Sequence, residues 1–144
     1  MAKLTLTRAN RIVNLALASA KQHALKPLCV VVFDAGGSVK AAQLQDGTPF
    51  GRFEVACGKA RAALVMGSGS RLLHEHAATR PHFVQGISSV LDGGIVPVPG
   101  GVLICSAKGE TLGAVGISGD TSDNDEIAAI ASIEGAGLVA KTGA

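Results

Sequence analysis

The chain has 144 residues, of which 47% are hydrophobic and 17% charged, and its net charge at pH 7 is +2. Few charges and many aliphatic residues favour collapse, so a disordered chain is excluded, and the length matches one domain spanning residues 1–144. The charges are scattered, and four Phe without Trp or Tyr give little aromatic surface. A nucleic-acid partner is therefore not expected.

The hydrophobic content also bears on assembly and compartment. A small monomer has to cover its surface with polar groups, so a mean hydropathy of +0.37 predicts that apolar surface contacts other copies in a homo-oligomer. Cys29, Cys57 and Cys105 lie far apart in apolar stretches, which is typical of free buried thiols. No stretch approaches the ~20 apolar residues of a membrane span, and the N-terminus lacks signal-peptide features, so we expect a cytoplasmic protein with no membrane partner.

A helix and a hairpin are expected first. Thr5 or Thr7 can cap a helix that runs to about Leu25, because its apolar residues recur at helical spacing. The β-branched run over residues 28–34 predicts a buried strand, and a reversal containing two glycines connects it to a partner strand over residues 39–44.

A second helix is expected from Thr48, as cap, and Pro49, in the first helical position, through Met66. Lys59 and Arg52 fall on its polar edge. Two apolar strips predict that it is covered on two sides. The main strip contains Phe50, Phe53, Cys57, Ala60 and Leu64, and the second contains Val55, Ala62 and Met66.

The next segment has weaker signals. Ser70 can cap a short helical piece that carries His74 and His76. Residues 79–94 contain Pro81 and several glycines that interrupt any period, so an irregular segment or a brief strand is expected there.

A second hairpin and a last helix complete the pattern. The runs Val102–Ser106 and Thr111–Ser118 flank a turn in which Gly109 can adopt a positive φ. A helix is expected from about Asp123 to Lys141. Its apolar stripe is expected to contain Ile127, Ile130, Ala131 and Leu138.

The expected strand links are turns rather than helical crossovers. They predict an α+β fold in which an antiparallel sheet of about five strands packs with helices, an α/β sandwich of the profilin or PAS type.

Familiar catalytic motifs are missing. The sequence has no G-x-S-x-G elbow, no G-x-x-x-x-G-K-[ST] phosphate loop and no H-E-x-x-H zinc helix. No metal site is therefore expected from motifs alone.

The histidines are candidate ligands for haem iron, because neutral imidazole coordinates it readily. In a helix His74 and His76 would point about 200° apart, so they would not chelate one ion together. The alternative is that these two and His82 are surface or capping residues. His23, on the apolar side of the first helix, is either a hydrogen-bonded core or interface residue or a ligand to haem held between subunits.

Three further groups can take part in binding or catalysis. The segment with Gly100 and Gly101 is either a plain strand entry or a nest of N–H groups that binds an anion. Lys59 can pair with such an anion, with Asp34 or with Asp125, or it can be solvated. Glu134 falls in the apolar stripe of the last helix, where a buried carboxylate would suit acid–base work. We favour a Glu134 turned to water by the glycines that follow it.

Six segments in this order resemble the GlcG/HbpS-like haem-binding, or haem-degrading, domain family, which also occurs as the C-terminal domain of PduO-type cobalamin adenosyltransferases. The likeness covers essentially the whole chain. The segments are Val31–Gly37, Asp46–Gly47, Gly58–Ala63, Pro97–Val102, Gly113–Gly119 and Asp123–Glu126.

The resemblance implies an α/β sandwich with an antiparallel sheet, assembly into dimers up to octamers, and haem or a related small ligand near subunit contacts. It also implies pocket or framework roles for the residues that match the shared pattern. These are Asp34, Lys59, Gly100, Gly101, Gly119 and Asp125.

Our leading hypothesis is a cytoplasmic, oligomeric haem- or tetrapyrrole-binding protein that assists haem storage or degradation. The candidate cofactor-binding residues are His23, His74, His76, Asp34, Gly100 and Gly101.

The alternative is a lyase or isomerase for an organic acid or an aromatic catabolic intermediate on the same scaffold. The Gly100–Gly101 backbone would hold its anion, and Lys59, Asp125 or a histidine would transfer the proton. Both hypotheses place the ligand cleft near Lys59 and Gly100. A third possibility is a structural accessory subunit without a ligand.

Overall fold

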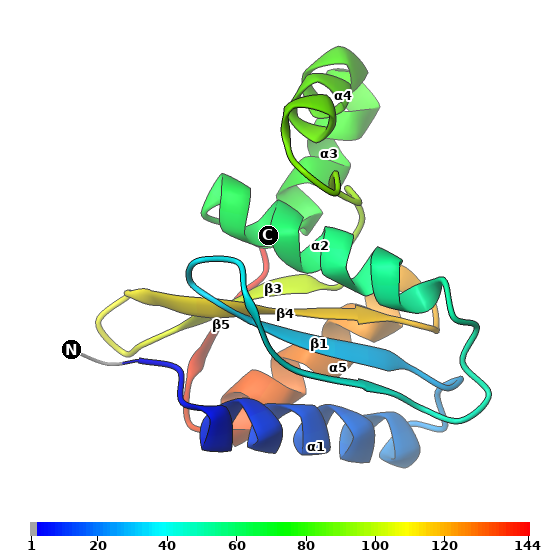
Figure 1. Ribbon diagram of the computed structural model, residues 1–144, viewed down its shortest axis with the longest axis vertical. Coiled ribbons are helices and arrows are strands. Elements are labelled where there is room, and N and C mark those ends of the chain that lie inside the picture. Colours follow the sequence, from blue (N-terminus) through cyan, green and yellow to red (C-terminus); the bar gives the residue numbers. More distant parts are fainter. Residues whose placement is uncertain (1–2) are drawn as a thin grey trace.

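A computed structural model describes residues 3–144, which fold into a three-layer α+β domain (Figure 1). Its five-stranded sheet has the order β2-β1-β4-β3-β5, with every neighbouring pair antiparallel. This confirms the expected fold class. The elements are α1 (Leu6–Gln22), β1 (Cys29–Asp34), β2 (Val39–Leu44), α2 (Arg52–Met66), α3 (Arg71–Thr79), α4 (Pro81–Val90), β3 (Gly101–Cys105), β4 (Thr111–Ser118), α5 (Ser122–Gly135) and β5 (Val139–Lys141).

Both expected hairpins are present, as β1–β2 and β3–β4. The two hairpins join through β1 and β4, with Cys29 opposite Ser118 and Asp34 opposite Gly113. Helix α1 begins as expected, because the Thr5 hydroxyl accepts a hydrogen bond from the Arg8 N–H at 3.1 Å.

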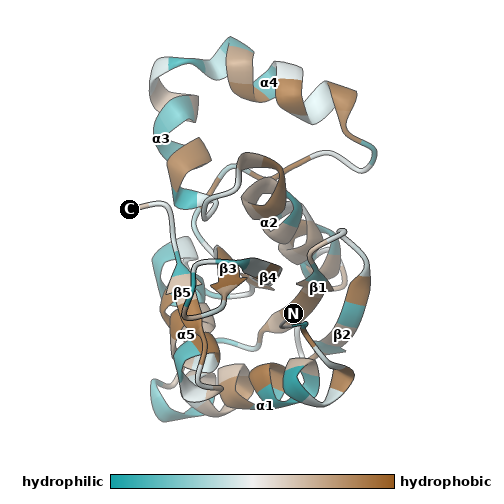
Figure 2. Ribbon diagram, turned by 90° about the vertical axis from the view of Figure 1, so that its left-hand side faces the viewer, coloured by the Kyte–Doolittle hydropathy of each residue, from teal (hydrophilic) through white to brown (hydrophobic). Residues whose placement is uncertain are grey.

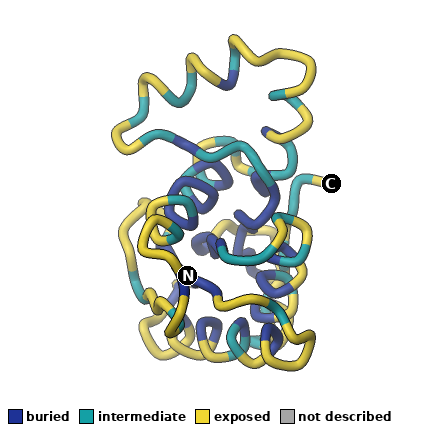
Figure 3. Tube along the Cα trace, turned by 90° about the vertical axis from the view of Figure 1, so that its right-hand side faces the viewer, coloured by how far each residue is buried: buried dark blue, intermediate teal, exposed yellow. Residues whose placement is uncertain are grey.

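The two faces of the sheet bury alternate residues of each strand, as the pleat requires. Val30, Val32 and Val115 lie in the larger cluster beneath α1 and α5. Val31 and Phe33 face the opposite way and pack under α2. Figures 1 and 3 show the sheet between these helices, with β1, β3 and β4 buried and the outer helical surfaces exposed.

Helix α2 meets the sheet through small residues, and the expectation that Phe50 and Phe53 belong to its buried face was wrong. Phe50 is 87% exposed and Phe53 39% exposed. Ala56 and Ala60 are fully buried instead, because the backbone of β4 approaches α2 closely at Gly116. Large side chains do not fit between the two.

The last helix is shorter than expected. It ends at Gly135, Gly137 follows with a φ of +78°, and the chain then forms β5 on the edge of β3. The expected stripe was also wrong for Ile127, which is 49% exposed, since α5 instead buries the side that carries Ala128 and Ala129. Glu134 is exposed, as favoured.

The expectation of an irregular segment or brief strand over residues 79–94 was also wrong, because α4 occupies most of it. Pro81 begins this helix in a position where the missing N–H costs nothing. Helices α3 and α4 form an arm beyond α2 (Figures 1 and 2). A small cluster that includes Ala62, Leu73 and Val84 holds the arm.

Two further features concern the described residues. The three cysteines are free and buried, as expected. Among residues 3–144 no helix combines the length and the apolar character that crossing a bilayer requires.

We expect Gly116→Ala to destabilise the domain by about 1–3 kcal/mol, because the added methyl group would overlap the carbonyl oxygen of Ala56. Gly86→Ala is the matched control, since nothing lies within 4 Å of a methyl group there and alanine favours the helix by about 1 kcal/mol. Urea unfolding measures both changes. A Gly116→Ala protein as stable as the parent would contradict the close approach of α2 and β4.

Candidate functional site

A buried ion pair joins α2 to α5 at one end of the sheet. The Lys59 Nζ lies 3.0 Å from Asp125 Oδ2 and donates a second hydrogen bond to the Ile117 carbonyl at 2.9 Å. The side chains are 2% and 1% exposed. Asp125 Oδ1 accepts a hydrogen bond from the Asp120 N–H at 3.0 Å. Both charged groups are thus hydrogen-bonded inside the protomer.

Burial governs the proton affinities of the pair. It lowers the pKa of Lys59 and raises the pKa of Asp125, and in each case the mutual attraction opposes the shift without cancelling it. The charged forms are therefore costly to bury, and each depends on the presence of the other.

The glycines expected to form an anion nest close this corner. Gly100 has a φ of +122°, and a side chain there would come within 2.9 Å of the Lys59 amine. The Gly101 N–H donates to Ser70 Oγ at 2.8 Å, and that hydroxyl donates to the Val98 carbonyl at 2.6 Å. Because the Gly101 N–H is bonded to Ser70, it is not available to an anion. Of the two alternatives that the sequence left open, the segment is therefore the strand entry.

The predicted cleft at Lys59 and Gly100 is consequently not open in a single copy of the protein. Gly100 is buried along with Lys59 and Asp125, so the three side by side make a packed junction. Proton transfer by Lys59 or Asp125 would require a substrate to reach atoms that the protomer covers.

His23 lies at the other side of the sheet, where it caps the C-terminus of α1. Its ring is exposed, and its Nδ1 lies 2.9 Å from the Ser19 carbonyl oxygen. A hollow of about 450 Å³, called here the α1 hollow, lies along this last turn of the helix. It is lined by Leu17, Ala18, Ala20, Lys21, Leu25, Pro27 and Gln45.

His74 and His76 both lie on α3, and its helical geometry points them apart, as expected for a helix. His74 is exposed. The His76 ring packs edge-on to Phe83 at 5.7 Å, and its Nδ1 has no hydrogen-bond partner among the residues described. No cluster of three or more His, Cys, Asp or Glu side chains suited to a metal ion occurs within residues 3–144.

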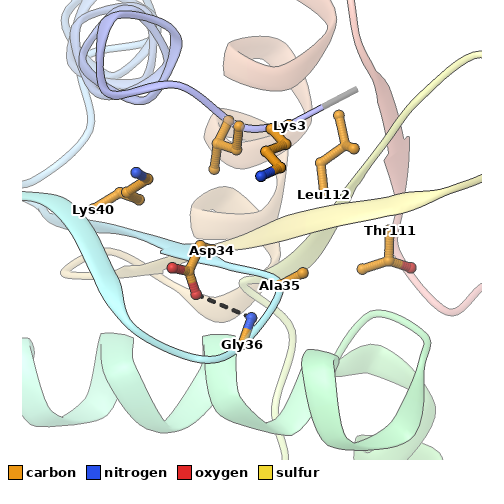
Figure 4. A pocket seen from close by; sticks show the side chains of 8 residues that line it. Lys3, Asp34, Ala35, Gly36, Lys40, Thr111 and Leu112 are labelled. Atoms are coloured by element: carbon orange, nitrogen blue, oxygen red, sulfur yellow. Dashed lines mark hydrogen bonds between the residues drawn. The ribbon is translucent and has the colours of Figure 1, made fainter. Parts of the chain in front are cut away.

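Asp34 ends β1 and shapes the following turn. Its Oδ1 accepts hydrogen bonds from the N–H groups of Gly36 and Ser38, each at 3.0 Å. A hollow of about 290 Å³, called here the turn hollow, opens beside it (Figure 4). It is lined by Lys3, Leu4, Asp34, Ala35, Gly36, Lys40, Thr111 and Leu112.

Sequence reasoning missed a second charged cluster, which connects the arm to α5. Arg71 donates to both carboxylate oxygens of Glu126 and, at 2.6 Å, to Asp123 Oδ1. The signal was present, because acidic residues in the first turn of a helix are available to an arginine as well as to the helix dipole. Only the fold brings Arg71 to them.

We expect Lys59→Met to destabilise the domain by about 3–5 kcal/mol, because it leaves the Asp125 carboxylate buried without its partner. Adding Asp125→Asn should restore much of the loss, since the amide oxygen still accepts from Asp120 and carries no charge. Chemical denaturation of the single and double variants measures this. A double variant less stable than Lys59→Met would show that the charge of Asp125 is not what destabilises the single variant.

Comparison with known proteins identifies a family and several solved structures that share this fold. The sequence matches the family described as haem-degrading protein HbpS-like over residues 4–134. No curated protein matches the sequence at a significant level.

Solved structures share the fold at low identity. A PduOC:heme complex is 24% identical with a TM-score of 0.83, covering 95% of this chain and 97% of that chain. Protein ORFY of Klebsiella pneumoniae is 21% identical with a TM-score of 0.82, covering 95% and 93%. A double mutant of HbpS from Streptomyces reticuli is 23% identical with a TM-score of 0.78, covering 93% and 87%.

Proposed function

The chain belongs to the HbpS-like haem-degrading family, and from this we propose that it binds haem or a related tetrapyrrole with His23 as the ligand to iron. A structural neighbour of the same fold is a haem complex, which supports the choice of cofactor. We further propose that the protein assists haem storage or degradation in the cytoplasm. Its three free cysteines are consistent with a reducing compartment.

The observation that carries the proposal is the hydrogen bond between His23 and the Ser19 carbonyl. A carbonyl oxygen only accepts, so the Nδ1 that faces it carries the proton. The Nε2 of the neutral ring then has its lone pair free. Histidines that bind metals are oriented in this way, with one nitrogen donating to a carbonyl and the other on the metal. Because the ring is exposed, a large planar ligand can reach it.

The α1 hollow lies at the same end of α1 as His23, which is not one of its lining residues, and it offers the apolar and cationic groups that haem requires. Leu17, Leu25 and Pro27 supply apolar surface for the porphyrin, and Lys21 supplies an ammonium group for a propionate. When bound, haem supplies an iron centre that can take a further ligand or exchange electrons. The protein's own contribution is the imidazole, the apolar wall and the cation.

Assembly would complete the binding surface, because the α1 hollow is open on its outer side. We propose a homo-oligomer, between dimer and octamer, whose contacts use the exposed apolar side chains. Phe50 is 87% and Val90 81% exposed, on the segment before α2 and at the end of α4. Large apolar side chains exposed on the protomer are available for such contacts.

We expect the parent protein to bind haem saturably at one site per copy, and His23→Ala to weaken binding by at least about tenfold through loss of the iron ligand. Absorption in the Soret band measures both. His82→Ala is the control, since His82 is also exposed but lies on α4. Retention of full affinity by His23→Ala, with loss in His74→Ala or His76→Ala, would place the ligand on α3 instead.

Phe50→Ser should shift the assembly toward smaller species at a given concentration, because it removes an aromatic group from the proposed contact. Sedimentation velocity across a concentration series measures the shift. Circular dichroism is the check on folding, and it should be unchanged because Phe50 is 87% exposed in the protomer. A parent protein that sediments as a single copy at every concentration would refute the oligomer.

A further inference from the structure

The turn hollow is a second concave site, built from parts of the chain that the haem proposal does not use. It lies beside the turn between β1 and β2, below the segment that leads into α1 (Figure 4). Lys3 reaches it from the N-terminal segment, Lys40 from β2, and Asp34 from the end of β1. Leu4 and Leu112 supply apolar walls. With a volume of about 290 Å³, it suits a small metabolite rather than a macrocycle.

Three charged side chains line the hollow. Among the residues described, none of Lys3, Lys40 and Asp34 takes part in an ion pair. In Figure 4 the side chains of Lys3 and Lys40 lie on opposite sides of the hollow, and Asp34 lies below the two amines. Two ammonium groups and one carboxylate leave a net charge of about +1, which a monoanion neutralises.

Asp34 also divides its two oxygens between different tasks. Oδ1 is engaged by the N–H groups of Gly36 and Ser38 and so is committed to the turn. No hydrogen bond to Oδ2 occurs within the described part of the chain. Because an ionised carboxylate only accepts, Oδ2 selects a ligand that presents a donor.

We propose that the turn hollow binds a small hydroxylated monocarboxylate. Its carboxylate lies between the ammonium groups of Lys3 and Lys40, its hydroxyl donates to Asp34 Oδ2, and its alkyl chain packs on Leu4 and Leu112. An amino acid would bring a zwitterion and leave the positive charge unbalanced. A phosphate dianion would leave excess negative charge beside Asp34. A hydroxy acid satisfies charge and hydrogen bonding together.

The test uses the haem-free protein and two acids that differ by one hydroxyl, 2-hydroxy-4-methylpentanoate and 4-methylpentanoate. Amide NMR titration should show shifts centred on Gly36, Ser38 and Leu112. The hydroxy acid should bind about tenfold more tightly, which is the size expected of one hydrogen bond to a charged acceptor. Since no haem is present, the result is independent of the role of His23.

Three variants separate the contributions. Lys40→Gln should weaken both acids, because it removes one ammonium group from the carboxylate site. Asp34→Asn should abolish the preference for the hydroxy acid, while its amide oxygen keeps the two N–H bonds of the turn. Lys26→Gln, which removes an exposed lysine that lines neither hollow, is the control and should change neither affinity.

Two results would overturn the proposal. Equal affinity of the parent protein for the two acids would remove the role of Asp34. Shifts that are as large elsewhere, or a Lys26→Gln protein weakened as much as Lys40→Gln, would reduce the binding to general attraction between lysines and carboxylates.

Discussion

The hydrogen-bonded ion pair of Lys59 and Asp125 determines how the layers of this domain meet. The helices that carry the two residues lie on opposite faces of the sheet (Figure 1). Their side chains meet near the end of β4, where the Ile117 carbonyl oxygen accepts a second hydrogen bond from Lys59. Two charges this deeply buried are tolerated only as a matched pair. The backbone of Gly100 lies against the lysine, so the helix can approach the sheet closely at this corner.

This packed corner explains why we assign ligand binding to other parts of the surface. A closed junction stabilises the fold and leaves no room for a substrate, whereas both ends of α1 border hollows. The C-terminal end carries His23 and borders the α1 hollow, and the N-terminal end follows Lys3 and Leu4, which line the turn hollow. The two surfaces have different chemistry, one suited to a metal-bearing macrocycle and the other to a small anion, so the two proposals stand or fall separately.

Much of the fold was predictable because its signals are local. The hairpins follow from β-branched runs separated by glycine-containing turns, and the Thr5 cap marks the start of α1. The failures arose where tertiary packing overrode periodicity. Phe50 belongs to an apolar strip by spacing, yet α2 begins only at Arg52 and leaves Phe50 exposed before it. Pro81 was taken as a breaker although it begins α4.

The candidate site was less predictable, because its members come from distant parts of the chain. Helical spacing predicts Lys59 on the polar edge of α2, with several possible partners. Its burial is explained by one of them, the ion pair with Asp125. The helical position of His23 identified it as a candidate ligand, but the sequence did not predict its hydrogen bond to the Ser19 carbonyl. Lys40 gave no signal at all, since its place beside Asp34 follows from the hairpin register.

The most direct test of the proposed haem site is the pattern of amide NMR broadening caused by paramagnetic ferric haem. Our account predicts that broadened signals cluster around the last turn of α1, over residues 17–27, and at Gln45, which line or border the α1 hollow. Signals of α3 should stay sharp, and those of the corner around Lys59 should broaden less than those of residues 17–27. Broadening centred on α3 or on that corner would contradict the account.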